Sequence, residues 1–194
     1  MGFAIAQAAY DRGAQVTIIA GATTVSPPSE LRVLHALTAE NMEAHAVREA
    51  RDATIFIGAA AVSDYRPQQI SNSKIKKSLS RLEVTFERTP DILAQLSQGR
   101  REGQIIVGFA AETENVIQYA RQKLDEKALD IVVANDVSRK GSGFDSENNV
   151  VSILTKGNSE VISLPIMSKL AAAHRILDEV VKLRQQQLFK TTKA

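Results

Sequence analysis

The most constraining feature of this sequence is a short apolar run that ends in four small residues and then in a charged loop. Residues 54–57 have the composition of a buried strand, and Gly58-Ala59-Ala60-Ala61 follows directly. In an open α/β sheet, ligands bind outside the carboxyl ends of the strands, where small residues let a ligand approach the backbone. Charged side chains come next, at Asp64, Arg66 and Lys74. We therefore expect a binding edge here, although a tight turn with solvated charges would also explain Gly-Ala-Ala.

Two later apolar runs end in a similar way. Residues 105–111 lead into Glu112, and residues 130–134 lead into Asn135 and Asp136. Because the carboxyl ends of parallel strands meet at one edge of a sheet, three such ends predict a single cleft.

The apolar periodicity between these strands predicts helices, which alternate with them. The fold class that this pattern indicates is α/β: a three-layer Rossmann-like domain with a mostly parallel sheet and a C-terminal β-hairpin plus helix. A helix over residues 2–12 followed by a strand is what normally follows the first strand of a doubly wound fold. We therefore expect that strand and its glycine-rich loop to lie before Met1.

The boundaries of several elements are predicted by their capping and turn residues. N-caps are expected at Thr38, with Asn41 as a rival, and at Thr89, with Pro90 in the first helical position. Other expected elements are a half-exposed strand over 82–87, a helix over 115–127, a hairpin over 150–164 and a terminal helix from Pro165 with Ile166, Leu170, Ala173, Leu177, Val180 and Val181 on its buried stripe.

Composition narrows the class of protein. The 194 residues fit one domain, with a core over 1–184 and a polar tail over 185–194 that is expected to fray. A net charge of +2 and the lack of any long apolar run give no sign of a nucleic-acid or membrane partner. The chain has no cysteine, its three histidines are scattered, and no signal peptide is recognisable, so we expect a cytoplasmic protein.

Several known catalytic motifs are incomplete or missing in this sequence. Tyr119 and Lys123 match the Tyr-x-x-x-Lys pair of short-chain dehydrogenases, but no Gly-x-Gly-x-x-Gly loop accompanies them. The chain contains no P-loop and no Gly-x-Ser-x-Gly nucleophile motif either. A nicotinamide-dependent reductase therefore remains a less favoured alternative.

Four separated segments together resemble a known family. Gly58-Ala-Ala-Ala-Val-Ser-Asp-Tyr-Arg-Pro67, Lys74-Ile-Lys-Lys77, Gly108-Phe-Ala-Ala-Glu-Thr113 and Ala134-Asn-Asp-Val-Ser138 occur in the order and spacing of bacterial phosphopantothenate–cysteine ligase. This enzyme is the C-terminal half of the bifunctional coenzyme A biosynthesis flavoprotein, and the resemblance extends from Met1 to about Leu183.

The resemblance implies a reaction and a set of site residues. The family uses CTP to activate 4′-phosphopantothenate as an acyl cytidylate, which the amine of cysteine then attacks to give 4′-phosphopantothenoylcysteine. By resemblance, Lys74 is the catalytic lysine, Lys76 and Lys77 begin a mobile flap, and Ala61 and Asn135 contact substrate. The nucleotide-binding positions implied are Gly58, Ala59, Ala60, Asp64, Lys74, Pro90, Asp91, Ile92, Leu93, Phe109, Lys123 and Lys127.

The family also suggests cofactors and partners. Magnesium accompanies the triphosphate, with no metal ligands assigned, and a homodimer is expected, with 82–87 as a candidate pairing strand. A phosphopantothenoylcysteine decarboxylase, separate or fused, is a possible partner, and no FMN is expected in this chain. The family's first loop and its Ser-Asn-x-Ser-Ser-Gly-Lys segment are absent from the sequence. A truncated remnant that folds without catalysing the reaction is thus the other alternative.

Overall fold

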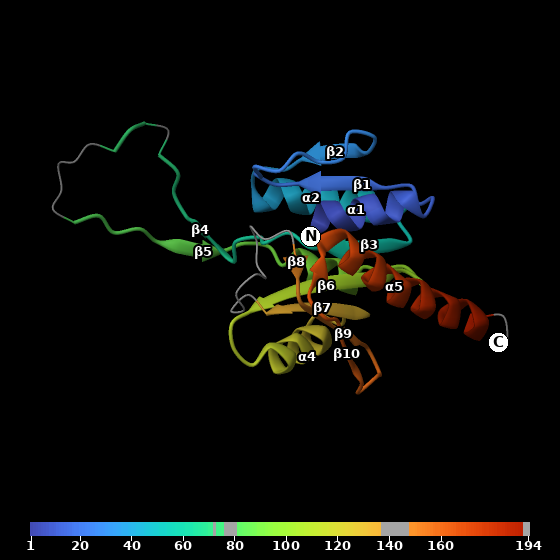
Figure 1. Ribbon diagram of the computed structural model, residues 1–194. Coiled ribbons are helices and arrows are strands. Elements are labelled where there is room, and N and C mark those ends of the chain that lie inside the picture. Colours follow the sequence, from blue (N-terminus) through green and yellow to red (C-terminus); the bar gives the residue numbers. More distant parts are fainter. Residues whose placement is uncertain (72, 76–80, 137–147, 192–194) are drawn as a thin grey trace.

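The computed structural model describes residues 1–71, 73–75, 81–136 and 148–191 (Figure 1). Its helices are α1 (Gly2–Asp11), α2 (Ala39–Ala50), α3 (Ile92–Gln98), α4 (Val116–Glu126) and α5 (Lys169–Thr191). Its strands are β1 (Thr17–Ala20), β2 (Arg32–His35), β3 (Ile55–Gly58), β4 (Tyr65–Pro67), β5 (Phe86–Arg88), β6 (Ile105–Glu112), β7 (Ile131–Asp136), β8 (Asn148–Asn149), β9 (Val151–Thr155), β10 (Val161–Ser163) and β11 (Met167–Ser168).

A five-stranded sheet in the order β10-β9-β7-β6-β3 forms the centre of the fold. The strands β3, β6 and β7 are parallel, whereas β9 runs antiparallel to β7 and forms the expected hairpin with β10. Parallel strands covered by helices on both faces have nearly continuous apolar sequences, and β6 and β7 are buried almost throughout.

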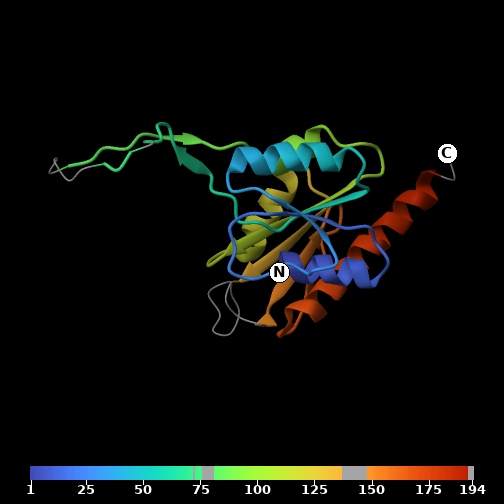
Figure 2. The same cartoon turned by 90° about the horizontal axis from the view of Figure 1, so that it is seen from above.

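Helices cover both faces of this sheet, which gives the three layers predicted from the sequence (Figure 2). Alternate residues of a strand point to opposite faces. Val107 and Val133 therefore pack against α1 and α5, while Ile106 and Val132 pack against α2, α3 and α4. The predicted α/β fold is confirmed.

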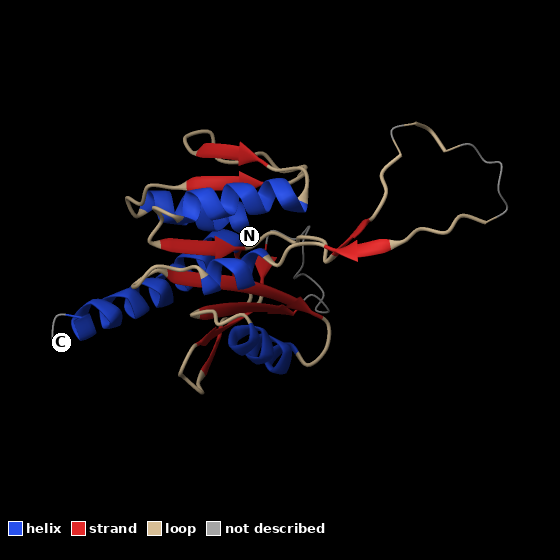
Figure 3. Cartoon of the chain, turned by 180° about the vertical axis from the view of Figure 1, so that it is seen from behind, coloured by secondary structure: helices blue, strands red, loops and turns tan. Residues whose placement is uncertain are grey.

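A separate pair of parallel strands, β1 and β2, lies beyond β3 (Figure 3). Among the described residues, β1 pairs with β2 alone and β3 pairs with β6 alone, so each has one edge without a strand partner. The same two helices contact both strands. Residues of α1 pack with Ile18 on one side and Ile55 on the other, and α2 packs with both Ile19 and Phe56. The strands β1 and β3 are therefore not paired with each other, and α1 and α2 cover the two faces of the break between them.

The strands β4 and β5 form an antiparallel ribbon at the root of a long arm that projects from the domain (Figures 1 and 3). We define the arm as the described residues 65–71, 73–75 and 81–88. Its large apolar side chains are exposed, including Ile70 at 82% and Leu82 at 61%. The strand predicted over 82–87 is confined to Phe86–Arg88, because only these residues face a partner strand.

Two other boundary predictions were wrong for local reasons, whereas Thr38 caps α2 as expected. Asp91, not Thr89, caps α3, since the Asp91 carboxylate accepts from the backbone N–H of Ala94. Pro165 does not begin α5, because β11 comes first and the Ser168 hydroxyl then accepts from Ala171 N–H.

The buried face of α5 is also displaced from the predicted stripe. Ala173, Leu177 and Val180 are buried as expected, but Ile166, Leu170 and Val181 are exposed, and Ile166 lies before the helix. Ala172 and Ile176 are buried in their place, so the buried face comprises Ala172, Ala173, Ile176, Leu177 and Val180. The helix continues to Thr191, past the start of the tail at 185, so fraying of that tail stays a prediction.

Candidate active site

The three predicted strand ends meet at one edge of the central sheet. Gly58, the last residue of β3, lies beside Gly108 of β6. Further along β6, Ala111 lies beside Asn135 of β7, and the next pair is Glu112 and Asp136. The parallel register therefore brings the small and polar residues of all three strands together, as the sequence predicted.

The two adjacent glycines allow α3 to approach the sheet. A Cβ atom at Gly58 would lie 2.8 Å from Cδ2 of Leu93, and one at Gly108 would lie 2.6 Å from Cδ1 of Leu129 and 3.3 Å from Cδ1 of Leu93. Distances below about 3 Å are far inside ordinary carbon–carbon contact. Packing against α3 is therefore one physical reason for glycine at position 58, and it places the start of α3 over the strand ends.

Asp91 joins the start of α3 to the end of α4. One carboxylate oxygen accepts from Ala94 N–H at 3.1 Å, and the other lies 2.9 Å from Nζ of Lys127. Partial burial disfavours the charged form of Asp91, but the hydrogen bonds from Lys127 and Ala94 outweigh it and lower the pKa of the carboxyl group. Two predicted nucleotide-binding residues are thus already paired with each other.

Lys123 reaches from α4 to the backbone of β6. Its Nζ donates to the carbonyl oxygen of Phe109 at 2.6 Å. Burial, with a smaller effect of neighbouring Lys127, lowers the pKa of the Lys123 ammonium, whereas Glu112, Asp91 and Asp64 oppose that shift. Lys123 is thus influenced by carboxylates of a strand end, a helix cap and the loop after β3.

The loop after β3 is held against the start of α3. Ala60, Ala61 and Asp64 are exposed. Thr89 fixes the far end of this loop, since its backbone N–H donates to Asp64 O at 3.0 Å and its hydroxyl donates to Ser63 O. Sequence reasoning missed this role of Thr89, and only the fold brings residues 63 and 89 together.

Asn135 has an unusual environment for a polar side chain. The residue is 8% exposed, and its side-chain oxygen accepts no hydrogen bond from any residue in the described parts of the chain. A buried polar atom without a partner costs free energy and often marks a functional position. Asn135 lies near the end of β7, and its contact with substrate stays a prediction.

Lys74 is not gathered with these residues. It lies in the segment of the arm between β4 and β5, which projects away from the sheet, and its side chain is exposed (Figure 1). Lys76 and Lys77, the predicted start of the flap, lie outside the described residues. The structure thus assembles the strand-end residues, α3 and the two lysines of α4, and holds Lys74 apart from them.

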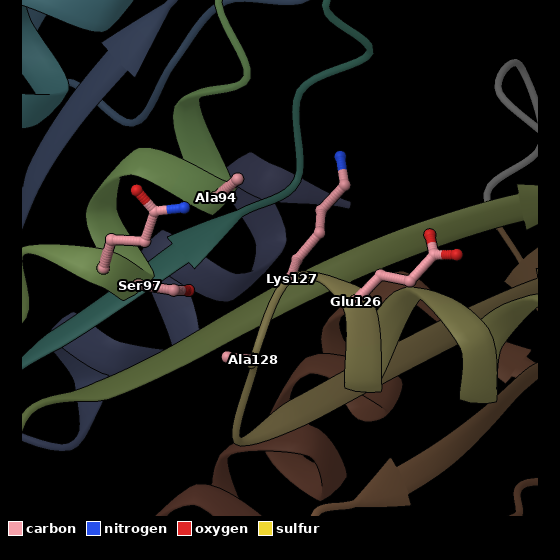
Figure 4. Close-up of a pocket in the computed structure, with 6 residues that line it drawn as sticks. Ala94, Ser97, Glu126, Lys127 and Ala128 are labelled. Atoms are coloured by element: carbon pink, nitrogen blue, oxygen red, sulfur yellow. The ribbon is translucent and has the colours of Figure 1, made fainter.

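A pocket of about 150 Å³ lies between α3 and the end of α4 (Figure 4). Lys127 is the one predicted site residue that lines it, and Glu126 points away from Ala94 and Ser97. Ser97 is 7% exposed, and its hydroxyl has no hydrogen-bond partner among the residues described. Lys127 therefore lines this pocket and also belongs to the predicted site at the strand ends.

Neither a cluster of metal-binding side chains nor a membrane-spanning helix occurs among the described residues. Within them, no three His, Cys, Asp or Glu side chains gather closely enough to hold a metal ion. No helix in that part of the chain is both long and apolar enough to cross a bilayer.

The fold and the site define a Rossmann-like α/β domain with a polar cluster at its strand ends. Residues 1–183 match the model of the DNA/pantothenate metabolism flavoprotein C-terminal domain. The chain belongs to this family.

Curated relatives and solved structures agree with that assignment. The chain is 40% identical over 184 residues to the coenzyme A biosynthesis bifunctional protein CoaBC of Escherichia coli strain K12, covering 93% of this chain and 45% of the relative. It is also 40% identical over 187 residues to CoaBC of Bacillus subtilis strain 168, covering 96% and 46%. The chain thus spans about half the length of the curated relatives it matches.

The structural neighbours have the same fold. The crystal structure of the C-terminal domain of CoaBC aligns with a TM-score of 0.79 and 32% identity, covering 95% of this chain and 82% of that one. The Cab2 mutant H337A in complex with phosphopantothenate-cysteine aligns with a TM-score of 0.74, covering 98% and 79%. Since its identity is 18%, this second likeness shows the fold alone.

Proposed function

We propose that this domain joins 4′-phosphopantothenate to L-cysteine at the expense of CTP, as a step of coenzyme A biosynthesis. The observation that carries the proposal is the pair of lysines, Lys123 and Lys127, held over the strand ends beside the start of α3. Such a site brings fixed positive charge to a place where phosphates can approach small residues. The similarity to the coenzyme A biosynthesis proteins CoaBC supports a role in that biosynthesis.

The proposed reaction has two steps. A carboxylate oxygen of 4′-phosphopantothenate attacks the α-phosphorus of CTP, and pyrophosphate leaves as the bond between the α- and β-phosphates breaks. The amine of cysteine then attacks the acyl carbon, loses a proton and releases CMP. The first step brings two anions together, so fixed cations stabilise the charge that develops in the transition state.

Each group of residues has a proposed role in these steps. Lys74 contacts the phosphates and the activated acyl group when the arm places it beside a bound nucleotide. Lys123 and Lys127 hold the nucleotide, and the side-chain oxygen of Asn135, which has no partner among the described residues, accepts from a donor of the substrate. The remaining proposed nucleotide contacts come from the loop after β3, the start of α3 and β6: Gly58, Ala59, Ala60, Asp64, Pro90, Asp91, Ile92, Leu93 and Phe109. Ala61 is the second proposed substrate contact.

Magnesium fits this site as an ion carried mainly by the triphosphate. Mg²⁺ keeps several waters and needs only one or two protein carboxylates when phosphates supply other ligands. Asp64 and Glu112 are near Lys123 and could provide them. When bound, the ion would neutralise phosphate charge.

We also propose that a second copy of the chain covers the apolar side chains of the arm. Ile70, Ile75, Leu82, Val84 and Phe86 are each at least 49% exposed. A concentration of exposed apolar groups on a projecting segment is typical of a protein interface. The homodimer, a decarboxylase partner and a cytoplasmic location are proposals that follow from the family.

Ligand-dependent stability distinguishes this function from a reductase. A ligand that binds the folded chain raises its melting temperature by mass action. CTP with magnesium should therefore raise the melting temperature, and K123M combined with K127M should abolish the shift. NADPH should have no effect. Stabilisation by NADPH but not by CTP would favour the reductase built on Tyr119 and Lys123 and refute the ligase.

A further inference from the structure

Arg66 links the root of the arm to a helix of the domain. It lies on β4, directly opposite Glu87 on β5. Its Nε donates to a carboxylate oxygen of Glu87 at 2.8 Å, and its Nη2 lies 2.7 Å from the same oxygen. Its Nη1 forms a close ion pair with Glu40, in the first turn of α2. One guanidinium therefore bridges both strands of the ribbon and the helical layer.

The ribbon needs such support to hold a direction. Each strand of the ribbon has three residues, and an isolated two-stranded ribbon is marginally stable in water. Backbone hydrogen bonds from Gln68 to Thr85 and from Thr89 to Asp64 continue the ribbon but do not connect it to α2. By contrast, α2 is anchored in the core through Ala46 and Ala50.

We propose that Arg66 is a positioning residue that fixes the angle at which the arm leaves the domain. By holding Glu40 and Glu87 together, it sets where the arm carries Lys74, and it steadies the neighbouring Asp64. This inference deepens the proposed ligase function and rests on it for its catalytic consequence, but the geometric part concerns the fold alone.

The chemistry of the cluster favours orientation over stability. The side chains of Arg66, Glu40 and Glu87 are 45%, 38% and 40% exposed, and ion pairs at such positions contribute little to folding. A planar guanidinium nevertheless fixes the directions of several hydrogen bonds, which a lysine cannot do. The hydrogen bond with Glu87, and the charges of both carboxylates, raise the pKa of Arg66, so the guanidinium stays protonated throughout the pH range of ordinary assays.

A distance measurement tests the geometric part. The chain has no cysteine, so spin labels can be placed at two introduced cysteines without removing any native thiol. Gln69 on the arm and Ala44 on α2 are both exposed and suit this purpose. We expect pulsed EPR to give a narrow distance distribution in the parent and a clearly broadened one with E40Q. The matched control is E49Q, because Glu49 lies on the same helix but pairs with Arg32 and Arg48.

Identical distributions for the parent and E40Q would overturn the inference, whether or not the protein is a ligase. A broadening with E49Q equal to that with E40Q would also overturn it, since a general loosening of α2 would then explain the result. The melting temperature of E40Q should stay within about 2 °C of the parent, as expected for an exposed pair.

Kinetics test the catalytic consequence. With CTP, phosphopantothenate and cysteine, E40Q and R66Q should each lower kcat about tenfold or more, because misplacing a reacting group is costly. R66K should recover part of the loss, and E49Q should keep the parental kcat. Full activity in E40Q despite a broadened arm would refute the positioning role. If neither the 194-residue chain nor a chain extended upstream shows turnover, the proposed function fails, and the EPR result still decides the geometric part.

Discussion

Lys127 forms an ion pair with Asp91 that connects the C-cap of α4 to the N-cap of α3, with Nζ and Oδ2 2.9 Å apart. Both residues are proposed nucleotide contacts, so in the free protein each partly neutralises the other. A bound triphosphate would compete with Asp91 for Lys127. The pair therefore connects the stability of the α3 cap to the affinity of the site.

Substitutions of Asp91 should separate these two roles. D91N keeps a side chain that can cap α3 but removes the charge, whereas D91A removes both. We expect D91A to lower the free energy of unfolding by about 1 kcal/mol more than D91N, which is the usual value of an N-cap. Urea denaturation of the two variants gives this difference directly. Equal stabilities would show that the hydrogen bond to Ala94 does not support α3.

The close approach of α3 to the sheet predicts a cost for a single methyl group. In G58A the new Cβ would lie 2.8 Å from Leu93, so either α3 or the leucine must move. We expect a loss of roughly 1–2 kcal/mol in unfolding free energy, typical of overpacking. G58A combined with L93A should lose less than the sum of the two single changes.

Gly2 provides the control for that experiment, because a Cβ at this position would meet Ala59 at an ordinary 3.7 Å. G2A should therefore be neutral or slightly stabilising in its helix. If G58A proves as harmless as G2A, the packing explanation for Gly58 is wrong.

Lys123 predicts a specific pH dependence of stability. Its pKa is lowered in the folded protein by burial and by Lys127, so between that lowered pKa and the ordinary lysine pKa of 10.5 the unfolded chain binds more protons. Stability contributed at this site therefore rises with pH across that window. We expect the melting temperature of the parent minus that of K123M to increase as the pH rises toward 10.5. A difference independent of pH would contradict the shift.

Much of this fold could be predicted from the sequence because its strands have uninterrupted apolar runs and its turns carry strong signals. Residues 105–112 and 131–136 became adjacent strands with their polar ends together, and Thr38 caps α2. The errors arose where two local signals competed. Thr89 and Asp91 are both good caps, and the choice between them depends on the pairing of Thr89 with Ser63, which joins residues 26 apart in the chain.

The candidate site was less predictable because several of its contacts join distant segments. Nothing in the local sequence shows that Lys127 meets Asp91 or that Arg66 meets Glu40. The motif of residues 58–67 indicated that the loop matters, but it could not separate a packing role for Gly58 from a ligand-binding one. The separation of Lys74 from the other site residues was also not foreseen, since position on a projecting arm leaves no periodic signal.

The facing edges of β1 and β3 predict that an additional strand would stabilise the protein. Backbone groups along these edges have no strand partner among the described residues, and Ile55, Phe56 and Ile57 are only half-buried. We propose that the strand lies upstream, as in a doubly wound fold. Placing ahead of Met1 the segment that precedes the matched region in Escherichia coli CoaBC should slow amide hydrogen exchange in β3 and raise the melting temperature. A glycine–serine segment of equal length is the control, and equal exchange in both proteins would refute this placement.

The most direct test of the central claim is to incubate the protein with CTP, magnesium, 4′-phosphopantothenate and cysteine, and to measure the condensed product and CMP together. The account predicts equal amounts of condensed product and CMP. The chain extended ahead of Met1, called the longer chain, should be more active than the 194-residue chain. K74Q should raise the activation barrier by several kcal/mol, which lowers the rate roughly a hundredfold or more. Its melting temperature should equal that of the parent. No product from the longer chain, or undiminished product from K74Q, would contradict the account.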